Sequence, residues 1–234
     1  MPMEISLIIP AYNEEKQILN TLISVIEYME ETPKSYEIIV VDDGSRDKTA
    51  EMVKSLEPYI KLISYRENRG KGYAVAEGVK AAKGEYIFFT DADLSYSPDY
   101  ITAGEKILLG GAELVVGRRD NKRSGYPVLR RQISKAYKRA VHHILPLEIE
   151  DCQCGFKGFR NSAAKRLFGD LKTKGFSFDT EILCRAQMYD MEIAEMPVIF
   201  QHKKDSKVSF SGGLKMVKDL YKIRRELFDG FNKG

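Results

Sequence analysis

Two aspartates one residue apart form the part of this sequence that is best suited to chemistry. Asp91 and Asp93 follow directly after the apolar run 86–89. In an extended chain such a pair points to one side, roughly 6.6 Å apart at a rise of ~3.3 Å per residue. Two hard carboxylate oxygens, with room for water and phosphate, suit Mg²⁺ or Mn²⁺ that carries a diphosphate. The alternative is an ordinary acidic loop after a buried strand, and the rest of the chain must decide between the two.

The elements that would position this pair form a repeating pattern of strand and helix. Apolar runs typical of buried strands occur at 5–9, 37–41, 60–65, 86–89, 114–116 and 193–200. Segments with helical spacing lie between them, and another helix is expected over 178–188. This alternation, with no obvious linker, predicts one α/β domain with a mostly parallel, Rossmann-like central sheet flanked by helices. Pro197 indicates that the last strand lies at an edge of the sheet.

Composition narrows the class of protein. The chain has 234 residues and a net charge of +3, so it lacks the overall basic signature of a nucleic-acid-binding protein. Its three cysteines, at 152, 154 and 184, are too few and too irregularly spaced for a zinc site or a disulfide framework. The first residues lack the pattern of a signal peptide, and no apolar run approaches the ~20 residues that span a bilayer. We therefore expect a cytoplasmic protein that meets any membrane at its surface.

Polar residues follow the first two expected strands at the carboxyl edge, where open α/β sheets bind ligands. Tyr12 and Glu14 come after the first strand, and the Tyr12 ring can stack on a nucleotide base. Asp42 and Asp43 come after the second, where either carboxylate can accept hydrogen bonds from a base N–H or a ribose hydroxyl. The ordinary alternative for this second loop is a helix cap from a neighbouring side chain, and both roles can coexist.

The turn at 68–72 adds a place for an anion. It contains two glycines and two cations, one of them Lys71, just before an expected helix. The N–H groups of a helix N-terminus and nearby positive charge favour phosphate. The spacing differs from that of a Walker motif, so this turn carries weight only together with the loops above.

Residues 118–139 are strongly basic. The segment contains nine Lys and Arg residues and only one acidic residue, Asp120. Apolar residues between 128 and 145 recur at loose helical spacing. A basic amphipathic helix is typical of a membrane-surface element or an anion site, whereas a surface helix packed on the sheet gives the same pattern. The segment 214–231 predicts a final amphipathic helix that is also basic.

Taken together, these motifs resemble the family-2 glycosyltransferases of the GT-A fold. The likeness rests on residues 10–14, 41–45 and 91–93, which are similar to that family's nucleotide-sugar site. Segments at 68–72, 151–159, 178–181 and 206–207 narrow the resemblance to the dolichyl-phosphate glucosyltransferases. The dolichyl-phosphate mannose synthases share a looser version of the same set. The resemblance covers nearly the whole chain as a single domain.

The resemblance implies a role for each matching position. The residues implied in holding the base, the ribose or another part of the substrates are Pro10, Tyr12, Glu14, Asp42 or Asp43, Lys71 and Asp179. Asp91 and Asp93 would hold the metal and the diphosphate. The residues implied in contacts to the phosphates or to a lipid-phosphate acceptor are Arg119, Arg130, Ser134 and Lys203. Three positions depart from the mannose synthases, which carry Gln at Ser95, Lys at Asp179 and Arg at Lys203.

The reaction that the resemblance implies is transfer of a sugar, with UDP-glucose as the favoured donor, to dolichyl or polyprenyl phosphate. It would be a single in-line displacement with inversion at the anomeric carbon, with residues 1–117 binding the nucleotide sugar and 118–234 facing the acceptor and the membrane. A phosphate monoester has a second pKa near ~6, so at pH 7 it is already an anionic nucleophile and needs no strong base. It needs cations to approach another anion, and arginine forks supply these best. We expect such an enzyme to lie peripherally on the cytoplasmic face of a membrane.

Other readings stay open. A GDP-mannose-dependent mannose synthase would share the same loops. A soluble family-2 transferase with a hydroxyl acceptor would need a carboxylate base, for which Asp179 or Glu181 are the candidates, although acids there also suit the first turn of a helix. A non-catalytic nucleotide-binding module would bind without turnover. A nucleotidyltransferase is disfavoured because no glycine-rich basic signature follows the first strand.

Overall fold

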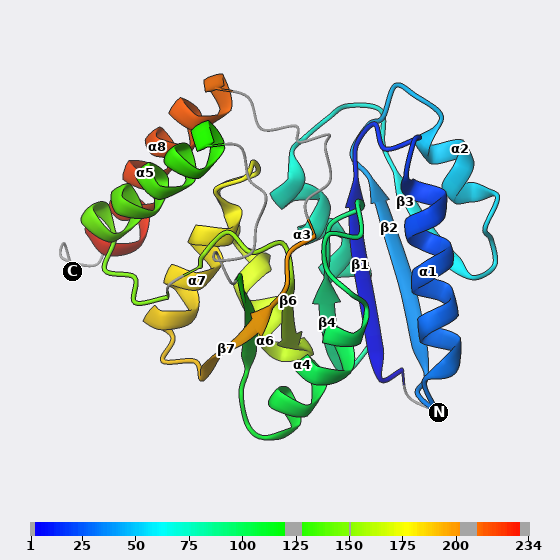
Figure 1. Cartoon of the computed structure of the whole chain (residues 1–234). Helices are drawn as coiled ribbons and strands as arrows, with labels where there is room; N and C mark the ends of the chain where they lie inside the picture. Colours follow the sequence, from blue (N-terminus) through cyan, green and yellow to red (C-terminus); the bar gives the residue numbers. More distant parts are fainter. Residues whose placement is uncertain (1–2, 120–127, 150, 202–209, 230–234) are drawn as a thin grey trace.

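The computed structural model describes residues 3–119, 128–149, 151–201 and 210–229, with side chains except at 128–135, 210–215 and 229. One sheet of seven strands forms the centre of this part of the chain, in the order β3-β2-β1-β4-β6-β5-β7 (Figure 1). The strands are β1 (Ile5–Ala11), β2 (Tyr36–Asp42), β3 (Ile60–Ser64), β4 (Tyr86–Phe89), β5 (Leu114–Arg119), β6 (Lys157–Arg160) and β7 (Ile193–Val198).

The sheet is mostly parallel, as the sequence predicted, and the six expected strands are present with small shifts at their ends. Pro197 does lie in an edge strand, because β7 ends the described order. One strand was missed: β6 pairs antiparallel with both β4 and β5. Its residues include Lys157 and Gly158, which are typical of a loop, and only partners far away in the sequence make a buried strand of them.

Helices cover both faces of the sheet. One face carries α1 (Ile18–Glu31), α2 (Thr49–Lys54) and α4 (Asp99–Leu109). The other carries α3 (Lys71–Ala81), α5 (Val128–Ile144), α6 (Asn161–Gly169), α7 (Phe178–Met188) and α8 (Phe210–Arg224), which continues into a π-helical turn at Arg225–Asp229. Strand β1 shows the underlying alternation, since Leu7 and Ile9 pack on the first face and Ile8 on the second.

The basic segment forms helix α5 from Val128 onward, whereas its first residues, Arg118 and Arg119, end β5. Tyr137, Val141 and Ile144 are buried in the core, while Lys138 and Arg139 are exposed. Helix α8 packs beside α5 on the outer side of this layer (Figure 1). In the part of α5 with described side chains, the apolar residues are thus used for packing, and Lys138 and Arg139 remain at the surface.

The strand register brings the expected site residues to one edge. Ala11 at the end of β1 pairs with Asp42 at the end of β2, and Ile8 pairs with Phe89 at the end of β4. The carboxyl ends of these three central strands therefore lie side by side. This is the edge where open α/β sheets bind ligands.

The ring of Phe88 fills the space between β4, β6 and α4. A Cβ added at Gly158 in β6 would lie 2.3 Å from Phe88 Cε1, and one added at Gly104 in α4 would lie 2.8 Å from the same atom. Phe88 itself is fully buried and stacks on Phe156, with ring centroids 6.0 Å apart. Glycine in these two elements is therefore a requirement of packing rather than of backbone conformation.

Gly158→Ala is expected to destabilise the protein by roughly 1–3 kcal/mol, because the new methyl group overpacks the core against the fully buried Phe88 ring. The matched control is Gly169→Ala in α6, where an added Cβ meets nothing within 4 Å and helix propensity favours Ala. Urea unfolding of both variants checks this prediction. Equal midpoints for the two variants would contradict it.

Candidate active site

The loop after β1 is fastened to the loop after β2. The N–H of Asn13 donates to Ser45 Oγ at 2.9 Å, and Asn13 Oδ1 accepts from the N–H of Arg46 at 2.8 Å. The N–H of Glu14 donates to Thr49 Oγ1 at 2.7 Å. Asn13 adopts a left-handed backbone with φ of 53°, a conformation that Asn tolerates better than most residues. The structure thus sets the segment Pro10 to Glu14 beside the end of β2, where the sequence predicted a nucleotide site.

Asp43 is fully occupied by its own chain. Its carboxylate accepts from the hydroxyl of Tyr65 at 2.8 Å and the side-chain amide of Asn68 at 2.9 Å. It also accepts from the backbone N–H groups of Arg69 and Gly70, at 2.8 and 2.9 Å. With two donors on each oxygen, Asp43 holds the turn before α3 in place and has little capacity for a ligand.

Asp42 is the better candidate for a contact with base or ribose. It is 2% exposed, and its carboxylate accepts from Ser64 Oγ at 2.9 Å and from the N–H of Ser45 at 3.2 Å. One donor on each oxygen leaves more acceptor capacity than Asp43 has. The sequence alone could not separate these neighbours, because the donors on Asp43 come from residues more than twenty positions away.

The turn held by Asp43 places Lys71 on the expected metal pair. Gly70 has φ of 101°, and a Cβ there would lie 2.4 Å from the carbonyl oxygen of Lys174, so only glycine fits. Lys71 then begins α3, and its Nζ lies 2.6 Å from Asp91 Oδ1. Burial disfavours the charged ammonium, but the carboxylates around it outweigh that cost and raise the pKa of Lys71.

Asp91 and Asp93 are both partly exposed and fit a divalent cation. Asp93 Oδ1 accepts from the N–H of Ser95 at 3.0 Å, and Asp93 Oδ2 accepts no hydrogen bond from the described part of the chain. No group of three or more His, Cys, Asp or Glu suited to a metal exists among the described residues. An ion here would therefore complete its shell with water or phosphate oxygens, as Mg²⁺ commonly does. The Ser95 hydroxyl is fully buried and has no hydrogen-bond partner in the described ranges.

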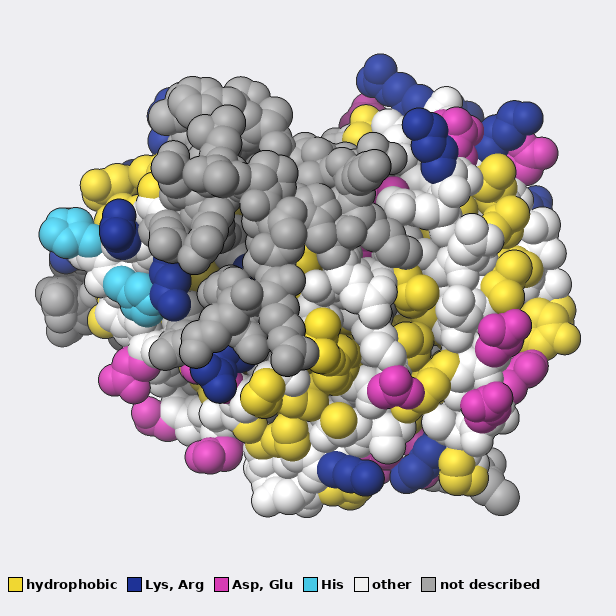
Figure 2. Space-filling model, in the orientation of Figure 1, with side chains coloured by type: hydrophobic (Ala, Val, Ile, Leu, Met, Phe, Trp, Pro, Cys, Tyr) yellow, Lys and Arg dark blue, Asp and Glu magenta, His cyan; other side chains and the backbone are white. Residues whose placement is uncertain are grey.

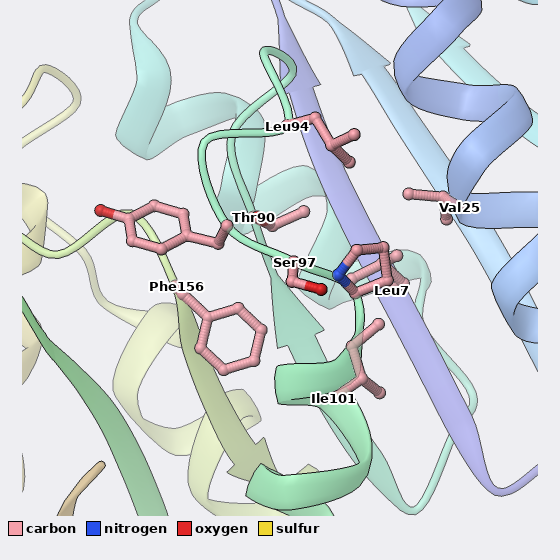
Figure 3. A pocket seen from close by; sticks show the side chains of 9 residues that line it. Leu7, Val25, Thr90, Leu94, Ser97, Ile101 and Phe156 are labelled. Atoms are coloured by element: carbon pink, nitrogen blue, oxygen red, sulfur yellow. The ribbon is translucent and has the colours of Figure 1, made fainter. Parts of the chain in front are cut away.

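A small, mostly apolar pocket lies beneath the loop that carries this pair (Figure 3). Thr90, Leu94 and Ser97 line it from the loop, and Leu7 and Ile101 line it from β1 and α4. Leu94 has a left-handed backbone with φ of 52°, which is uncommon for a bulky residue. The loop that carries Asp91 and Asp93 thus has backbone strain at Leu94 and a small pocket below it.

Arg119 is paired with a carboxylate. Its Nε and Nη2 donate to the two oxygens of Asp151, each at 2.7 Å, and its backbone N–H donates to Asp151 at 3.1 Å. Burial opposes ionisation of Asp151, but these bonds and the charge of Arg119 outweigh it and lower the pKa of Asp151. Arg119 therefore stays charged at the carboxyl edge of the sheet. A phosphate group that binds there would either compete with Asp151 for Arg119 or bind beside the pair. Sequence reasoning gave Asp151 no role of its own.

Lys157 and Asp179 form a second, deeper pair. Lys157 is 0% exposed and its Nζ lies 2.6 Å from Asp179 Oδ1. The same ammonium donates to the carbonyl oxygens of Cys152 and Cys154, at 3.3 and 2.7 Å. Burial raises the pKa of Asp179, against the opposing charges of Lys157 and Lys71. Lys157 was also missed; its only signal was a lysine inside an aromatic, glycine-punctuated stretch.

Glu181 serves the fold. It is 1% exposed and accepts from the N–H groups of Lys172 and Thr173, from the Thr173 hydroxyl, and from Arg185. The remaining predicted residues cannot be placed as side chains. Arg130 and Ser134 lie on α5 within the part described by its backbone alone, and Lys203 lies outside the described residues.

Comparison with known sequences agrees with the geometry. The family model described as "Glycosyl transferase family 2" matches residues 6–168. A dolichyl-phosphate beta-glucosyltransferase of Trichomonas vaginalis is 36% identical over 233 residues, which cover 92% of this chain and 69% of the relative. The Homo sapiens dolichyl-phosphate beta-glucosyltransferase is 33% identical over 255 residues, which cover 97% of this chain and 76% of the relative.

Solved structures share the architecture. Glucosyl-3-phosphoglycerate synthase from Mycobacterium tuberculosis, solved with Mn²⁺, UDP-glucose and phosphoglyceric acid, has a TM-score of 0.71 at 18% identity, covering 96% of this chain and 79% of that one. Mannosyl-3-phosphoglycerate synthase from Rubrobacter xylanophilus has a TM-score of 0.75 at 16% identity, covering 99% and 76%. At such low identity these structures establish the fold alone. With the family match over most of the sheet, they lead to one assignment: the chain belongs to glycosyl transferase family 2 and is a glycosyltransferase of the GT-A fold.

Proposed function

We propose that this enzyme transfers glucose from UDP-glucose to dolichyl or polyprenyl phosphate, with inversion, and that it requires Mg²⁺ or Mn²⁺. The relatives named above act, by their names, on dolichyl phosphate and transfer glucose. Structural neighbours have been solved with UDP and either Mn²⁺ or Mg²⁺. These findings support the donor, acceptor and cation named here.

The choice of acceptor rests on one observation: both candidate bases, Asp179 and Glu181, are already paired within the chain. Asp179 is 4% exposed and pairs with the buried Lys157, and Glu181 is surrounded by donors from its own chain. A hydroxyl acceptor needs a reachable carboxylate to take its proton. A phosphate acceptor is ionised at neutral pH and needs none. The geometry therefore favours the phosphate.

The residues at this edge fit the two demands of such a reaction. Asp91 and Asp93 would hold the cation, which would supply Lewis-acid stabilisation of the leaving diphosphate. Lys71 and Arg119 add positive charge where two anionic substrates must approach each other. Asp42 would bind the nucleoside beside the loop that carries Tyr12.

We further propose that the enzyme lies peripherally on the cytoplasmic face of a membrane, with α5 and α8 toward the lipid. None of the helices in the described ranges has the length and apolar character needed to cross a bilayer. Lys138, Arg139, His142 and His143 are exposed on α5. Figure 2 shows Lys or Arg side chains close to histidine side chains on one side of the molecule. Helix α8 adds exposed Lys222 and Tyr221 beside it. Basic residues near an anionic surface contribute about 1 kcal/mol each.

The donor and the metal are tested together with polyprenyl phosphate as acceptor. We expect glucose transfer from UDP-glucose in Mg²⁺ or Mn²⁺, and none after EDTA. Asp91→Asn should lower kcat/KM at least about tenfold, because a neutral amide holds the cation poorly. The exposed Asp99→Asn serves as the control and should keep activity. Faster transfer from GDP-mannose would assign a mannose synthase instead, and full activity in EDTA would remove the metal from the proposal.

The acceptor is tested with two arginines on the same helix. Arg130→Ala should lower kcat/KM for polyprenyl phosphate at least about tenfold, the cost of one hydrogen bond to a charged group. Arg139→Ala, at an exposed arginine of α5, is the matched control. With the acceptor in neutral detergent, so that no anionic membrane surface contributes, it should change kcat/KM little. Asp179→Asn is measured beside them with its thermal midpoint, because it weakens a buried ion pair. A folded but inactive Asp179→Asn with a nearly normal Arg130→Ala would favour the hydroxyl acceptor.

Membrane attachment is tested by sedimentation with vesicles. We expect binding to anionic vesicles that weakens as salt is raised, since screening shortens the reach of surface charge. Arg139→Glu should weaken binding, whereas Lys54→Glu, on α2 across the sheet, should not. Binding that ignores both salt and lipid charge would argue against this orientation.

A further inference from the structure

The ammonium of Lys71 already contacts Asp91, one of the two candidate metal ligands. Its Nζ lies 2.6 Å from Asp91 Oδ1, and both side chains are partly exposed, at 18% and 29%. The pairing is built into the fold, because Lys71 is the first residue of α3 and the preceding turn is held by Asp43. The Lys71 ammonium also lies over the Phe178 ring, 6.0 Å from its centre.

Asp91 has little room for a further ligand while this contact lasts. Its Oδ2 faces the backbone of Gly155 so closely that a Cβ there would lie 2.0 Å from the oxygen. Its Oδ1 carries the lysine. Asp93, in contrast, has an oxygen that the described part of the chain leaves without a hydrogen bond. A divalent ion approaching the free protein would therefore meet one open carboxylate and one that is covered by a positive charge.

We propose that Lys71 is a placeholder cation: it holds Asp91 until the divalent ion and the donor diphosphate arrive together, so that the ion binds weakly to the free protein and tightly to the nucleotide complex. This inference rests on the proposed function, because it concerns the same metal and the same donor. It adds the order of binding and names the residue that imposes it.

The physical reason is the balance of charge at the site. A divalent ion on Asp91 and an ammonium on the same carboxylate repel each other strongly at such short range. The diphosphate of the donor brings negative charge that accommodates both cations at once. Lysine suits this exchange, since its compact charge sits on a flexible stem with three rotatable donors and can turn from a carboxylate to a phosphate oxygen. Since binding couplings are reciprocal, the ion must raise the affinity for UDP by the same factor that UDP raises the affinity for the ion.

The test measures Mn²⁺ binding to the folded protein by electron paramagnetic resonance or calorimetry, with and without UDP, and no turnover is involved. In the wild-type protein we expect weak Mn²⁺ binding that tightens markedly with UDP. Lys71→Met removes the charge and keeps an apolar stem, so Mn²⁺ should bind the free protein at least about tenfold more tightly, the effect of one nearby unit charge in a partly solvated site. The gain in affinity caused by UDP should shrink accordingly.

Two further variants keep the test decisive. Lys71→Gln serves as a second neutral variant should Lys71→Met fold poorly, which circular dichroism and the thermal midpoint will show. Lys174→Met is the matched control, because Lys174 is an exposed cation 5.4 Å from the Tyr73 ring at the same edge, and it should leave free-protein Mn²⁺ binding unchanged.

The outcomes separate this inference from the proposed function. If wild-type protein binds Mn²⁺ only with UDP and the neutral variants bind it without, both stand. If wild-type protein binds Mn²⁺ with UDP but neither neutral variant gains affinity in its absence, the placeholder is overturned and the metal-dependent function survives. If Lys174→Met raises the Mn²⁺ affinity of the free protein as much as Lys71→Met does, the gain comes from the lower overall charge. The placeholder role of Lys71 is then likewise overturned. If no protein binds Mn²⁺ in either state, the metal-dependent function itself fails.

Discussion

The candidate site depends on the hydrogen bonds and the ion pair of the buried Lys157 ammonium. A charge without access to water is costly unless it is paired and fully hydrogen-bonded. Lys157 meets this condition with a carboxylate from α7 and two carbonyl oxygens from the segment just before β6. That segment also presents Asp151 to Arg119 and the backbone of Gly155 to Asp91. One desolvated cation thus fixes the position of a strand, a helix and the segment that contacts Arg119 and Asp91.

Around this point the site is arranged as pairs of opposite charge. Lys71 lies on Asp91, Arg119 on Asp151, and Lys157 on Asp179. The pairs grade in depth, from partly exposed at Asp91 to fully buried at Lys157. The cations of the candidate site are therefore already oriented by carboxylates of the same chain. The outer pairs can exchange partners with a substrate, because they touch solvent, whereas breaking the inner one would leave a charge stranded in the core.

The sequence predicted what is local and left open what depends on distant partners. The strand before Asp91 and Asp93 was evident, because an apolar run and two acids lie within eight residues. The strand β6 was not, since Lys157 becomes a core residue only through Asp179, twenty-two positions later. The difference between Asp42 and Asp43 was also hidden, because the donors that saturate Asp43 come from the turn after β3. The pairing of Arg119 with Asp151 was hidden for the same reason, since the two residues are thirty-two positions apart. Periodicity carries no information about contacts between residues far apart in the sequence. The charged residues could therefore be found, but their partners could not.

The reversed direction of β6 has a consequence for how this active site can vary. In a parallel strand, the loop that follows the strand lies at the ligand-binding edge. Because β6 runs against its neighbours, with Lys157 opposite both Phe89 and Val116, it is the chain entering the strand that reaches that edge. The segment before β6 therefore shapes this edge directly, although the connections between the parallel strands lie elsewhere in the chain. The chain leaving β6 at Arg160 turns directly into α6 at the opposite edge, away from the candidate site.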